Sequence, residues 1–585
     1  MPEVQLTGRR LAGGAAQGAL LHSDTGLSFW GGIDPASGEV IDRHHPLSGE
    51  IVAGRVLALP SGRGSCTGSS VLLELILNGH APAALVLAEP DEILTLGVLI
   101  AEVVFDRSIP VLCVGHEAFA TLRGARYARI GEAGLTLADT AFVDAPPPLA
   151  PPAADASTVR LTAADRRLLE GGEGRAAQVG MQILLRMAEL QGADELIDIT
   201  QAHIDGCIYT GPASLRFARQ LCDWGARVKV PTTLNSISVD QRRWRQLGIA
   251  PALGEPASAL GDAYVEMGAR PSFTCAPYLL DSAPAAGEQV VWAESNAVVY
   301  ANSVLGARTL KYPDFLDICI ALTGRAPFTG CHRAEARHAS MVIELPPLAA
   351  LDDAFYPLLG HLAGALCGSA IPVLCGLEAA ALTPDDLKAF GAAFATTSAT
   401  PMFHILGVTP EAPTLERALG GQAPQRRVTI DAAQLLAAWE ELNSAEEPEV
   451  GLVALGNPHF SLTELARLAS LCRGRSRHPE VALVVTCGRE IHAQARAAGL
   501  LETLSAFGVE VLTDTCWCML TEPVVPTTAR TLMTNSGKYA HYAPGLVGRR
   551  VRFGSLAACV EAACSGRADA GLPAWLAIAL QQGNR

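Results

Sequence analysis

The stretch Gly451-Leu452-Val453-Ala454-Leu455 is apolar at every position after its glycine, as is typical of a strand that is buried on both faces of a sheet. Further strand-like runs lie at residues 195–199, 341–345 and 481–485, and segments of helical length separate them. Strands that alternate with helices predict parallel, doubly wound sheets, whose binding sites lie at the carboxyl ends of the strands. We therefore expect an α/β protein whose larger part contains two lobes of this kind.

A segment rich in proline and alanine divides the sequence at residues 144–156. Proline opposes both helix and sheet, so this segment predicts an extended linker. It separates a small N-terminal domain, residues 1–143, from a large domain, residues 157–585.

Local signals predict individual elements on both sides of this linker. In the small domain, the predicted strands are residues 51–59, 84–88 and 111–114. In the large domain, Thr162 is expected to cap a helix that runs through Glu170. Residues 176–190 have the amphipathic period of a second helix.

Composition indicates a compact α/β enzyme rather than a nucleic-acid or membrane protein. The 585 residues are 49% hydrophobic and 18% charged, with a formal net charge of -15. An acidic chain without a basic stripe is a poor partner for a phosphate backbone. The sequence contains no signal peptide and no apolar run long enough to span a bilayer, so we expect a cytoplasmic protein. Its 15 cysteines then predict reduced thiols rather than disulfides.

The densest polar segment is Thr534-Asn535-Ser536-Gly537-Lys538-Tyr539-Ala540-His541-Tyr542. Lysine is rare in this sequence and occurs only at positions 229, 311, 388 and 538. A lysine among Asn, Ser, His and Tyr side chains therefore indicates a polar binding site, where its ammonium suits a substrate carboxylate. The alternative is a lysine at a surface turn. His203 and His541 are further candidates for acid, base or anion contacts, although a lone histidine is more often structural.

A glycine- and serine-rich loop, residues 60–70, lies between a predicted strand and the helix-like run 71–77. Free backbone N–H groups at such a helix start can bind an anion. The loop lacks the Gly-Lys-Ser/Thr of a P-loop, so it does not imply nucleotide binding. An ordinary helix-capping loop explains it equally well.

Two cysteines are candidate metal ligands because a cysteine just past the end of a strand can present its thiolate to a metal. Cys275 lies in Thr274-Cys275-Ala276-Pro277-Tyr278, and Cys516 follows the predicted strand 509–512. Each of them alone is more often a buried structural residue. The segment 456–461 also follows a strand, but Asn-Pro and Ser461-x-x-Glu464 are typical of a turn and a helix cap. In segment 292–303, polar side chains interrupt an apolar stretch and require partners, from either a ligand or an ordered loop.

Together these segments resemble the aconitase X family in its fused form, where a small swivelling domain precedes the large aconitase-like catalytic domain. The resemblance covers nearly the whole length and depends on several motifs in order. The motifs are Ser61-Gly62-Arg63-Gly64-Ser65, Ala202-His203-Ile204-Asp205-Gly206, Pro231-Thr232-Thr233-Leu234-Asn235, Thr274-Cys275-Ala276-Pro277-Tyr278, Glu294-Ser295-Asn296-Ala297-Val298, Asp514-Thr515-Cys516 and Thr534-Asn535-Ser536-Gly537-Lys538.

The resemblance implies a hydro-lyase whose cofactor is iron, expected as an iron–sulfur cluster. Family activities include the dehydration of cis-3-hydroxy-L-proline and, in two-subunit archaeal enzymes, of phosphomevalonate. The fused layout favours the hydroxyproline dehydratase. The expected partner is thus a small hydroxy acid, with neither nucleic acid nor membrane.

The resemblance also implies roles for individual residues. Cys275 and Cys516 correspond to two thiolate ligands, while a third ligand position falls on Asn457. Asparagine departs from a three-cysteine cluster, for which Cys331 or Cys518 are possible substitutes.

The implied mechanism removes water from a 3-hydroxy amino acid, with iron as Lewis acid on the leaving hydroxyl. Ser65 corresponds to the family's proposed base, which needs nearby N–H groups and Arg63 to act as an alkoxide. Lys538 is the second candidate catalytic residue. The expected substrate-binding residues are Arg63, Asn296, Ser536 and His203.

Three alternatives remain open at this point. A phosphomevalonate dehydratase should need a basic phosphate pocket, and the motifs contain no distinctive Lys/Arg cluster. A small-molecule binding protein of the same architecture would contain no iron. A zinc site at Cys516, Cys518 and a histidine is disfavoured because Cys-x-Cys is cramped for two zinc ligands.

Overall fold

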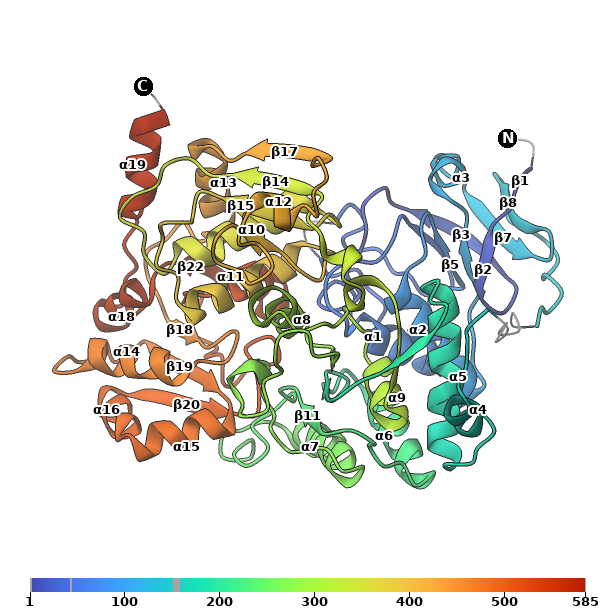
Figure 1. Cartoon of the computed structure of the whole chain (residues 1–585), viewed down its shortest axis with the longest axis horizontal. Helices are drawn as coiled ribbons and strands as arrows, with labels where there is room; N and C mark the ends of the chain where they lie inside the picture. The colour runs from blue at the N-terminus through green and yellow to red at the C-terminus, as the bar shows by residue number, and fades with distance from the viewer. Residues whose placement is uncertain (1–2, 43–44, 151–157, 584–585) are drawn as a thin grey trace. The chain divides into compact units, whose positions relative to one another are not determined.

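Alternating strands and helices fold into two compact units in the computed structural model, which describes residues 3–42, 45–150 and 158–583 (Figure 1). The first unit comprises residues 1–232, 262–269 and 312–329. The second comprises residues 233–261, 270–311 and 330–585. Within the described ranges, no helix combines the length and apolar character that crossing a bilayer requires.

The first unit contains an eight-stranded mixed sheet, in the order β1-β8-β7-β3-β4-β5-β6-β2. Its parallel centre is β3 (Ala16–His22), β4 (Val56–Leu59), β5 (Ala84–Leu87) and β6 (Val111–Cys113). Its other strands are β1 (Val4–Leu6), β2 (Arg9–Ala12), β7 (Tyr127–Gly131) and β8 (Gly134–Ala138). The helices of this part are α1 (Gly68–Asn78), α2 (Glu92–Phe105) and α3 (His116–Ala120).

The predicted strands of this sheet are confirmed with one correction. Strands β5 and β6 match the predictions, whereas the strand expected over 51–59 begins only at Val56. Residues 53–55 form a turn in which Gly54 has a φ of 70°, a conformation that favours glycine. In the predicted linker, residues 144–150 are neither helix nor strand, and residues 151–157 lie outside the described residues.

The remaining elements of the first unit begin with α4 (Ala163–Leu169), which Thr162 caps as predicted. They continue with α5 (Arg175–Leu190), β9 (Leu196–Asp198), β10 (Ala202–Ile204), α6 (Pro212–Asp223), α9 (Leu316–Thr323) and β13 (Arg325–Pro327). The expectation that residues 195–199 join a parallel sheet is wrong, because β9 pairs antiparallel with β13. Its charged Asp198 is the exposed residue of this otherwise mostly buried ribbon, and it accepts a hydrogen bond from Arg325 at 2.6 Å.

Two parallel sheets form most of the second unit, as predicted. One has the order β16-β15-β14-β17, and the other β20-β19-β18-β21-β22. The strands are β14 (Met341–Glu344), β15 (Pro372–Cys375), β16 (His404–Ile405), β17 (Arg426–Thr429), β18 (Leu452–Leu455), β19 (Ala482–Cys487), β20 (Val509–Thr513), β21 (Thr531–Thr534) and β22 (Arg550–Phe553).

The helices of the two sheets follow the strands in alternation. They are α10 (Phe355–Cys367), α11 (Pro384–Thr397), α12 (Leu415–Ala418), α13 (Ala432–Leu442), α14 (Leu462–Cys472), α15 (Arg489–Ala497), α16 (Leu500–Phe507), α17 (Gly537–Val547), α18 (Leu556–Ser565) and α19 (Ala574–Gly583). The second unit also contains β12 (Val291–Trp292), α8 (Ser295–Tyr300) and a π-helical turn (Ala301–Leu305). Strand β11 (Thr232–Leu234) and helix α7 (Pro251–Glu266) each include residues of both units.

Strand β18 shows why its sequence is apolar throughout. Leu452 and Ala454 pack into one core with residues of α10, α11, α13 and α17. Val453 and Leu455 point the other way, into a core with residues of α14, α16 and α18. Because side chains alternate across a strand, a sheet covered on both faces needs apolar residues at every position.

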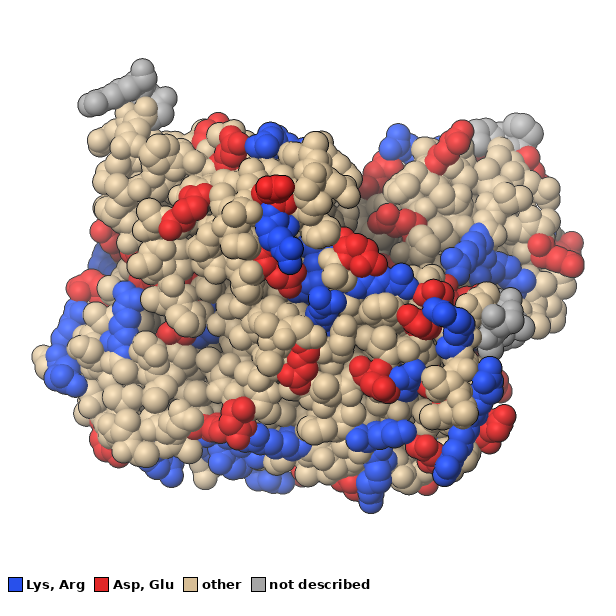
Figure 2. Space-filling model, viewed as in Figure 1, with Lys and Arg blue, Asp and Glu red and all other residues tan. Residues whose placement is uncertain are grey.

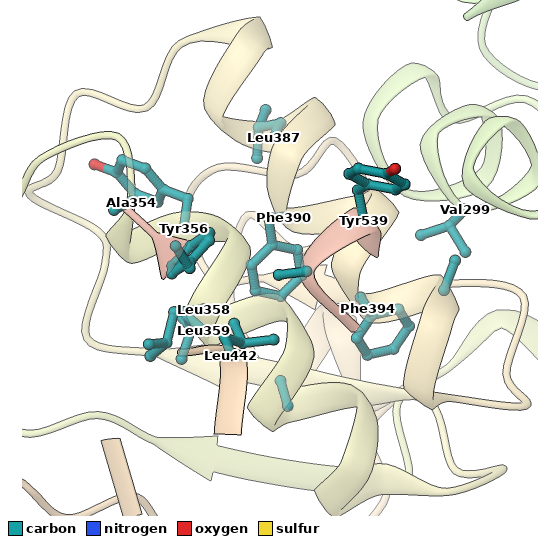
Figure 3. Close-up of a cluster of buried hydrophobic side chains, with 14 of the residues drawn as sticks. Val299, Ala354, Tyr356, Leu358, Leu359, Leu387, Phe390, Phe394, Leu442 and Tyr539 are labelled. Carbon is teal, nitrogen blue, oxygen red and sulfur yellow. The ribbon is translucent and has the colours of Figure 1, made fainter. Parts of the chain in front are cut away.

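The larger core is densest where α10 and α11 meet (Figure 3). Phe390 and Phe394 of α11 belong to one buried cluster with Leu358 and Leu359 of α10 and Tyr539 of α17. Glycine permits this close approach. A Cβ added at Gly360 of α10 would lie 2.2 Å from Phe390 O.

On the face shown in Figure 2, basic side chains are interspersed with acidic ones. Among the exposed ion pairs of the described residues, Arg270 pairs with Asp281 at 2.8 Å and with Glu490 at 3.0 Å. Such exposed pairs contribute little stability individually.

A test of the α10–α11 contact compares two glycines of this helix pair. We expect Gly360→Ala to lower the free energy of unfolding by about 1–3 kcal/mol, because the added methyl group forces the helices apart. Gly391→Ala is the matched control, since its Cβ would lie at an ordinary 3.7 Å from Phe403 and Val299. The control should be neutral or stabilising by up to about 1 kcal/mol through helix propensity. Urea unfolding measures both, and equal stability of the two variants would contradict the packing argument.

Candidate active site

Five polar segments of the second unit converge on one buried site. Three of them follow carboxyl ends of strands in the five-stranded sheet: residues 456–459 after β18, 514–518 after β20 and 535–538 after β21. The other two are residues 274–276 and the start of α8 at 294–296. This is the edge of a parallel sheet where doubly wound proteins place their sites.

The turn after β20 is held by Asp514. This residue has a φ of 70°, which is uncommon for a residue with a side chain. Its carboxylate accepts hydrogen bonds from Arg489 Nε at 2.5 Å and Nη2 at 2.8 Å, and its carbonyl accepts one from Ile237 N at 2.7 Å. These contacts fix the direction in which Thr515 and Cys516 leave the strand.

Two cysteine sulfurs contact Asn457, and the sulfur of a third cysteine lies against one of them. The side-chain amide of Asn457 donates to Cys516 Sγ at 3.5 Å and to Cys518 Sγ at 3.2 Å. Cys516 also hydrogen-bonds to Cys275, whose sulfur accepts the backbone N–H of His459 at 3.3 Å. The Cys275 contact, followed by burial, raises the pKa of Cys516 against a lowering contribution from Cys518. A bound metal cation reverses this preference and stabilises thiolates.

Asn457 leaves one atom of the site unsatisfied. The residue is only 5% exposed, and its Oδ1 has no hydrogen-bond partner among the described residues. Buried polar atoms are normally paired, so an orphaned amide oxygen beside three sulfurs indicates a place for a ligand or a cation.

Lys538 forms a largely buried ion pair with Glu294. Lys538 Nζ lies 2.8 Å from Glu294 Oε1, and the two side chains are 13% and 8% exposed. Asn296 Nδ2 donates to the same oxygen at 2.6 Å, while Asn235 Nδ2 donates to Oε2 at 3.3 Å. Burial raises the pKa of Glu294, but the ammonium of Lys538 and these hydrogen bonds outweigh it and lower the pKa overall. The pair's stabilisation is therefore present at neutral pH and fades only as the pH falls through this lowered pKa.

His459 connects three of the segments. Its Nε2 lies 2.7 Å from Thr515 O, which can only accept, so Nε2 carries the proton. Its Nδ1 then accepts from Thr274 Oγ1 at 3.1 Å. Burial lowers the pKa of His459 to about 4, so the ring is neutral and structural. With both ring nitrogens occupied, His459 does not supply the histidine of the zinc alternative.

The other predicted residues lie in the first unit. Ser65 Oγ donates to Thr67 Oγ1 at 3.2 Å and accepts the Thr67 N–H at 3.3 Å, just before α1. Arg63 pairs with Asp42 at 2.9 Å. His203 is fully buried on β10, two residues before Asp205.

The structure thus brings five predicted residues together in the second unit. They are Cys275, Cys516, Asn457, Asn296 and Lys538. The sixth residue of this unit, Ser536, caps α17 by accepting the Tyr539 N–H at 3.1 Å. Cys331 belongs to a different network, where its carbonyl accepts from Arg337 at 3.0 Å.

Two residues of the site were not predicted. Glu294 lies inside the motif at 294–298. The sequence feature that could have identified it is a carboxylate in an apolar stretch with few cations nearby to pair with it. His459 was part of a segment interpreted only as a turn and helix cap. That cap is present, since Ser461 and Glu464 form a capping box at α14, but the histidine beside it organises the site.

We expect Lys538→Met to cost about 3–5 kcal/mol of stability, because it leaves the Glu294 carboxylate buried without a cation. The double variant Lys538→Met with Glu294→Gln should recover most of this loss. Denaturant unfolding of the two variants measures the difference. As a control, Arg567→Met breaks an exposed pair with Glu449 (2.6 Å, side chains 61% and 62% exposed) and should cost at most about 1 kcal/mol. A double variant no more stable than the single one would contradict the pairing.

Family models match the chain along most of its length. They are described as the aconitase X swivel domain (residues 5–137) and the aconitase X first (158–335), second (339–440) and third (450–565) domains. A solved structure of Thermococcus kodakaraensis aconitase X (holo-form) superposes with a TM-score of 0.62 at 29% identity, covering 69% of this chain and 100% of that one.

Curated relatives agree with these matches. The chain is 63% identical to cis-3-hydroxy-L-proline dehydratase of Pseudomonas aeruginosa, over 97% of this chain and 98% of the relative. It is 56% identical to the protein of the same name from Hypocrea jecorina, over 97% of both. The phosphomevalonate dehydratase large subunit of Methanothermobacter thermautotrophicus is 34% identical over 67% of this chain and 95% of the relative. The chain, with its small swivel domain followed by a large aconitase-like α/β domain, therefore belongs to the aconitase X family.

Proposed function

We propose that the chain is a hydro-lyase that dehydrates cis-3-hydroxy-L-proline to a pyrroline-2-carboxylate. The observation that carries this proposal is 63% and 56% identity, over nearly the full length, to two proteins named for that reaction. Phosphomevalonate is the weaker candidate. The large-subunit relative named for it is 34% identical and matches only 67% of this chain.

We propose the division into residues 1–143, a linker at 144–156 and residues 157–585. The swivel-domain match ends at residue 137 and the first-domain match begins at residue 158, which supports a boundary in this interval.

The donors around Asn457 fit an iron or iron–sulfur centre. Cys275, Cys516 and Cys518 would supply thiolates, the usual ligands of such centres, and the orphaned Oδ1 of Asn457 adds a neutral oxygen. Bound iron would supply a Lewis acid for the leaving hydroxyl. Side chains of the protein would carry out the remaining steps, which are substrate binding and proton removal.

In this proposal Lys538 binds the substrate carboxylate. Its ammonium has further hydrogens beyond the one directed at Glu294, so one cation can serve both carboxylates. Asn296 has both amide hydrogens committed, to Glu294 Oε1 at 2.6 Å and to Cys275 O at 3.0 Å. Its Oδ1 accepts from Tyr278 Oη at 2.9 Å and keeps a second lone pair, which suits the N–H of the substrate ring.

Ser65 is the proposed base that removes the proton from the carbon next to the carboxylate. A serine hydroxyl needs help to ionise, and two neighbours provide it. The Thr67 N–H points at Ser65 Oγ, and Thr67 Oγ1, which accepts from Ser65, donates on to Asp205 Oδ2 at 3.5 Å. Arg63, committed to Asp42, contributes positive charge to this loop. His203 then has a positioning role beside Asp205 on the same segment.

The decisive experiment combines metal analysis with turnover. The protein is purified anaerobically, its iron and sulfide are measured, and dehydration of cis-3-hydroxy-L-proline is assayed in wild type, Ser65→Ala and Cys516→Ala. We expect both variants to lose at least about 100-fold in turnover, with iron lost only in Cys516→Ala. Full turnover in Ser65→Ala would remove the serine from the mechanism. Iron without turnover would indicate a different hydroxy acid, and absence of both would favour a metal-free binding protein.

A second experiment identifies the third sulfur. Cys518→Ser should lower bound iron because this sulfur contacts both Cys516 and Asn457. Cys331→Ser is the control, since Cys331 is a buried cysteine that belongs to the Arg337 network. Iron and sulfide per chain are the readout. Loss of iron in Cys331→Ser with retention in Cys518→Ser would reverse the assignment.

A further inference from the structure

Three helices of the second unit each direct one side chain of the metal-binding type toward a common point. His361 lies on α10, Glu441 on α13 and His541 on α17. One ring nitrogen of each histidine and one carboxylate oxygen all lie within 4.8 Å of one another. His541 is one of the polar residues that the sequence singled out, and the proposed reaction does not use it.

The distances in this cluster suit a metal ion. His361 Nε2 lies 3.2 Å from Glu441 Oε1. A tetrahedral zinc ion with ligands at about 2.0 Å separates neighbouring ligand atoms by roughly 3.3 Å. The rings of His361 and His541 are 5.5 Å apart and inclined by 49°, so they neither stack nor block each other's nitrogens.

One of the three residues is buried and the other two are exposed. His361 is 3% exposed, and its Nδ1 has no hydrogen-bond partner among the described residues. Glu441 and His541 are exposed, so the cluster opens to solvent on one side. A simple surface ion pair would not explain why a buried imidazole meets a second histidine as well as a carboxylate.

We propose that His361, Glu441 and His541 form a binding site for a divalent transition metal of the zinc class. Two imidazoles and one carboxylate are typical zinc ligands, and the solvent side leaves a fourth position for water. This ligand set shares no residue with the cysteine site and contains no sulfur, so the two sites should select different metals. Binding needs only neutral imidazoles and an ionised carboxylate, with no redox step.

The consequence for the fold concerns α17. His541 lies three residues after Lys538, one turn along the same helix. A metal bridging α10, α13 and α17 would fix the first turns of α17, and with them the helix that carries Lys538 to Glu294. Metal that binds only the folded chain also raises its stability.

The test uses the iron-loaded protein. Wild type, His541→Ala and Glu441→Gln are dialysed against micromolar zinc chloride, and zinc and iron per chain are measured. These variants change exposed residues, which avoids the buried His361. His116→Ala is the matched control, because His116 also faces a glutamate, Glu89 at 3.7 Å, on an exposed surface. Thermal unfolding with and without zinc gives a second readout.

We expect wild type and His116→Ala to bind one zinc ion that His541→Ala and Glu441→Gln bind at least about tenfold more weakly. Iron should be the same in all four proteins, and zinc should raise the unfolding temperature only in the first two. Equal zinc affinity in wild type and His541→Ala would overturn the proposal. Zinc that disappears together with iron would assign the binding to the cysteines and overturn it as well.

Discussion

Glu294 and Lys538 are 244 positions apart in sequence and form a largely buried ion pair, and the other polar segments of the site are arranged around it. A buried carboxylate requires a full set of partners, which Lys538, Asn296 and Asn235 provide. Asn296 in turn holds the carbonyl of Cys275, so the position of that cysteine depends on the ion pair. The start of α8, next to Glu294, and the start of α17, at Lys538, are therefore held together because the buried carboxylate needs a cation.

Hydrogen bonds between neutral groups hold the parts of the site that the ion pair does not contact. His459 accepts from Thr274 and donates to Thr515, and its lowered pKa keeps both contacts intact near neutral pH. Its carbonyl accepts from Lys388 at 3.2 Å, and Lys388 also pairs with Glu464 at the cap of α14. The loop after β18 is thus anchored on α11 and α14. Because the N–H of His459 in this loop donates to Cys275 Sγ, the anchoring also helps to fix the position of the sulfur.

Local sequence patterns predicted the elements whose structure is determined locally. Strand β18 and strand β19 were recognised because a doubly covered strand must be apolar throughout, and the cap at Thr162 because its partner is three residues away. The antiparallel pairing of β9 escaped prediction because it depends on β13, more than a hundred residues later. The motifs singled out Cys275 and Cys516, whose ligand roles remain predictions, whereas His459 was missed because its role lies in contacts with Thr274 and Thr515, which no local pattern reveals.

In the proposed metal site, Asn457 would balance charge without a third anionic ligand at that position. The ammonium of Lys538, although paired with Glu294, lowers the pKa of Cys516 and Cys518, whereas His459 carries no charge. Neutral donors add hydrogen bonds to the sulfurs: the amide of Asn457 toward Cys516 and Cys518, and the N–H of His459 toward Cys275. A cysteine at position 457 would remove two of these donors and add a negative charge. In the proposed site, asparagine would therefore stabilise thiolates as a donor while its Oδ1 accepts a cation, two functions that a thiolate cannot combine.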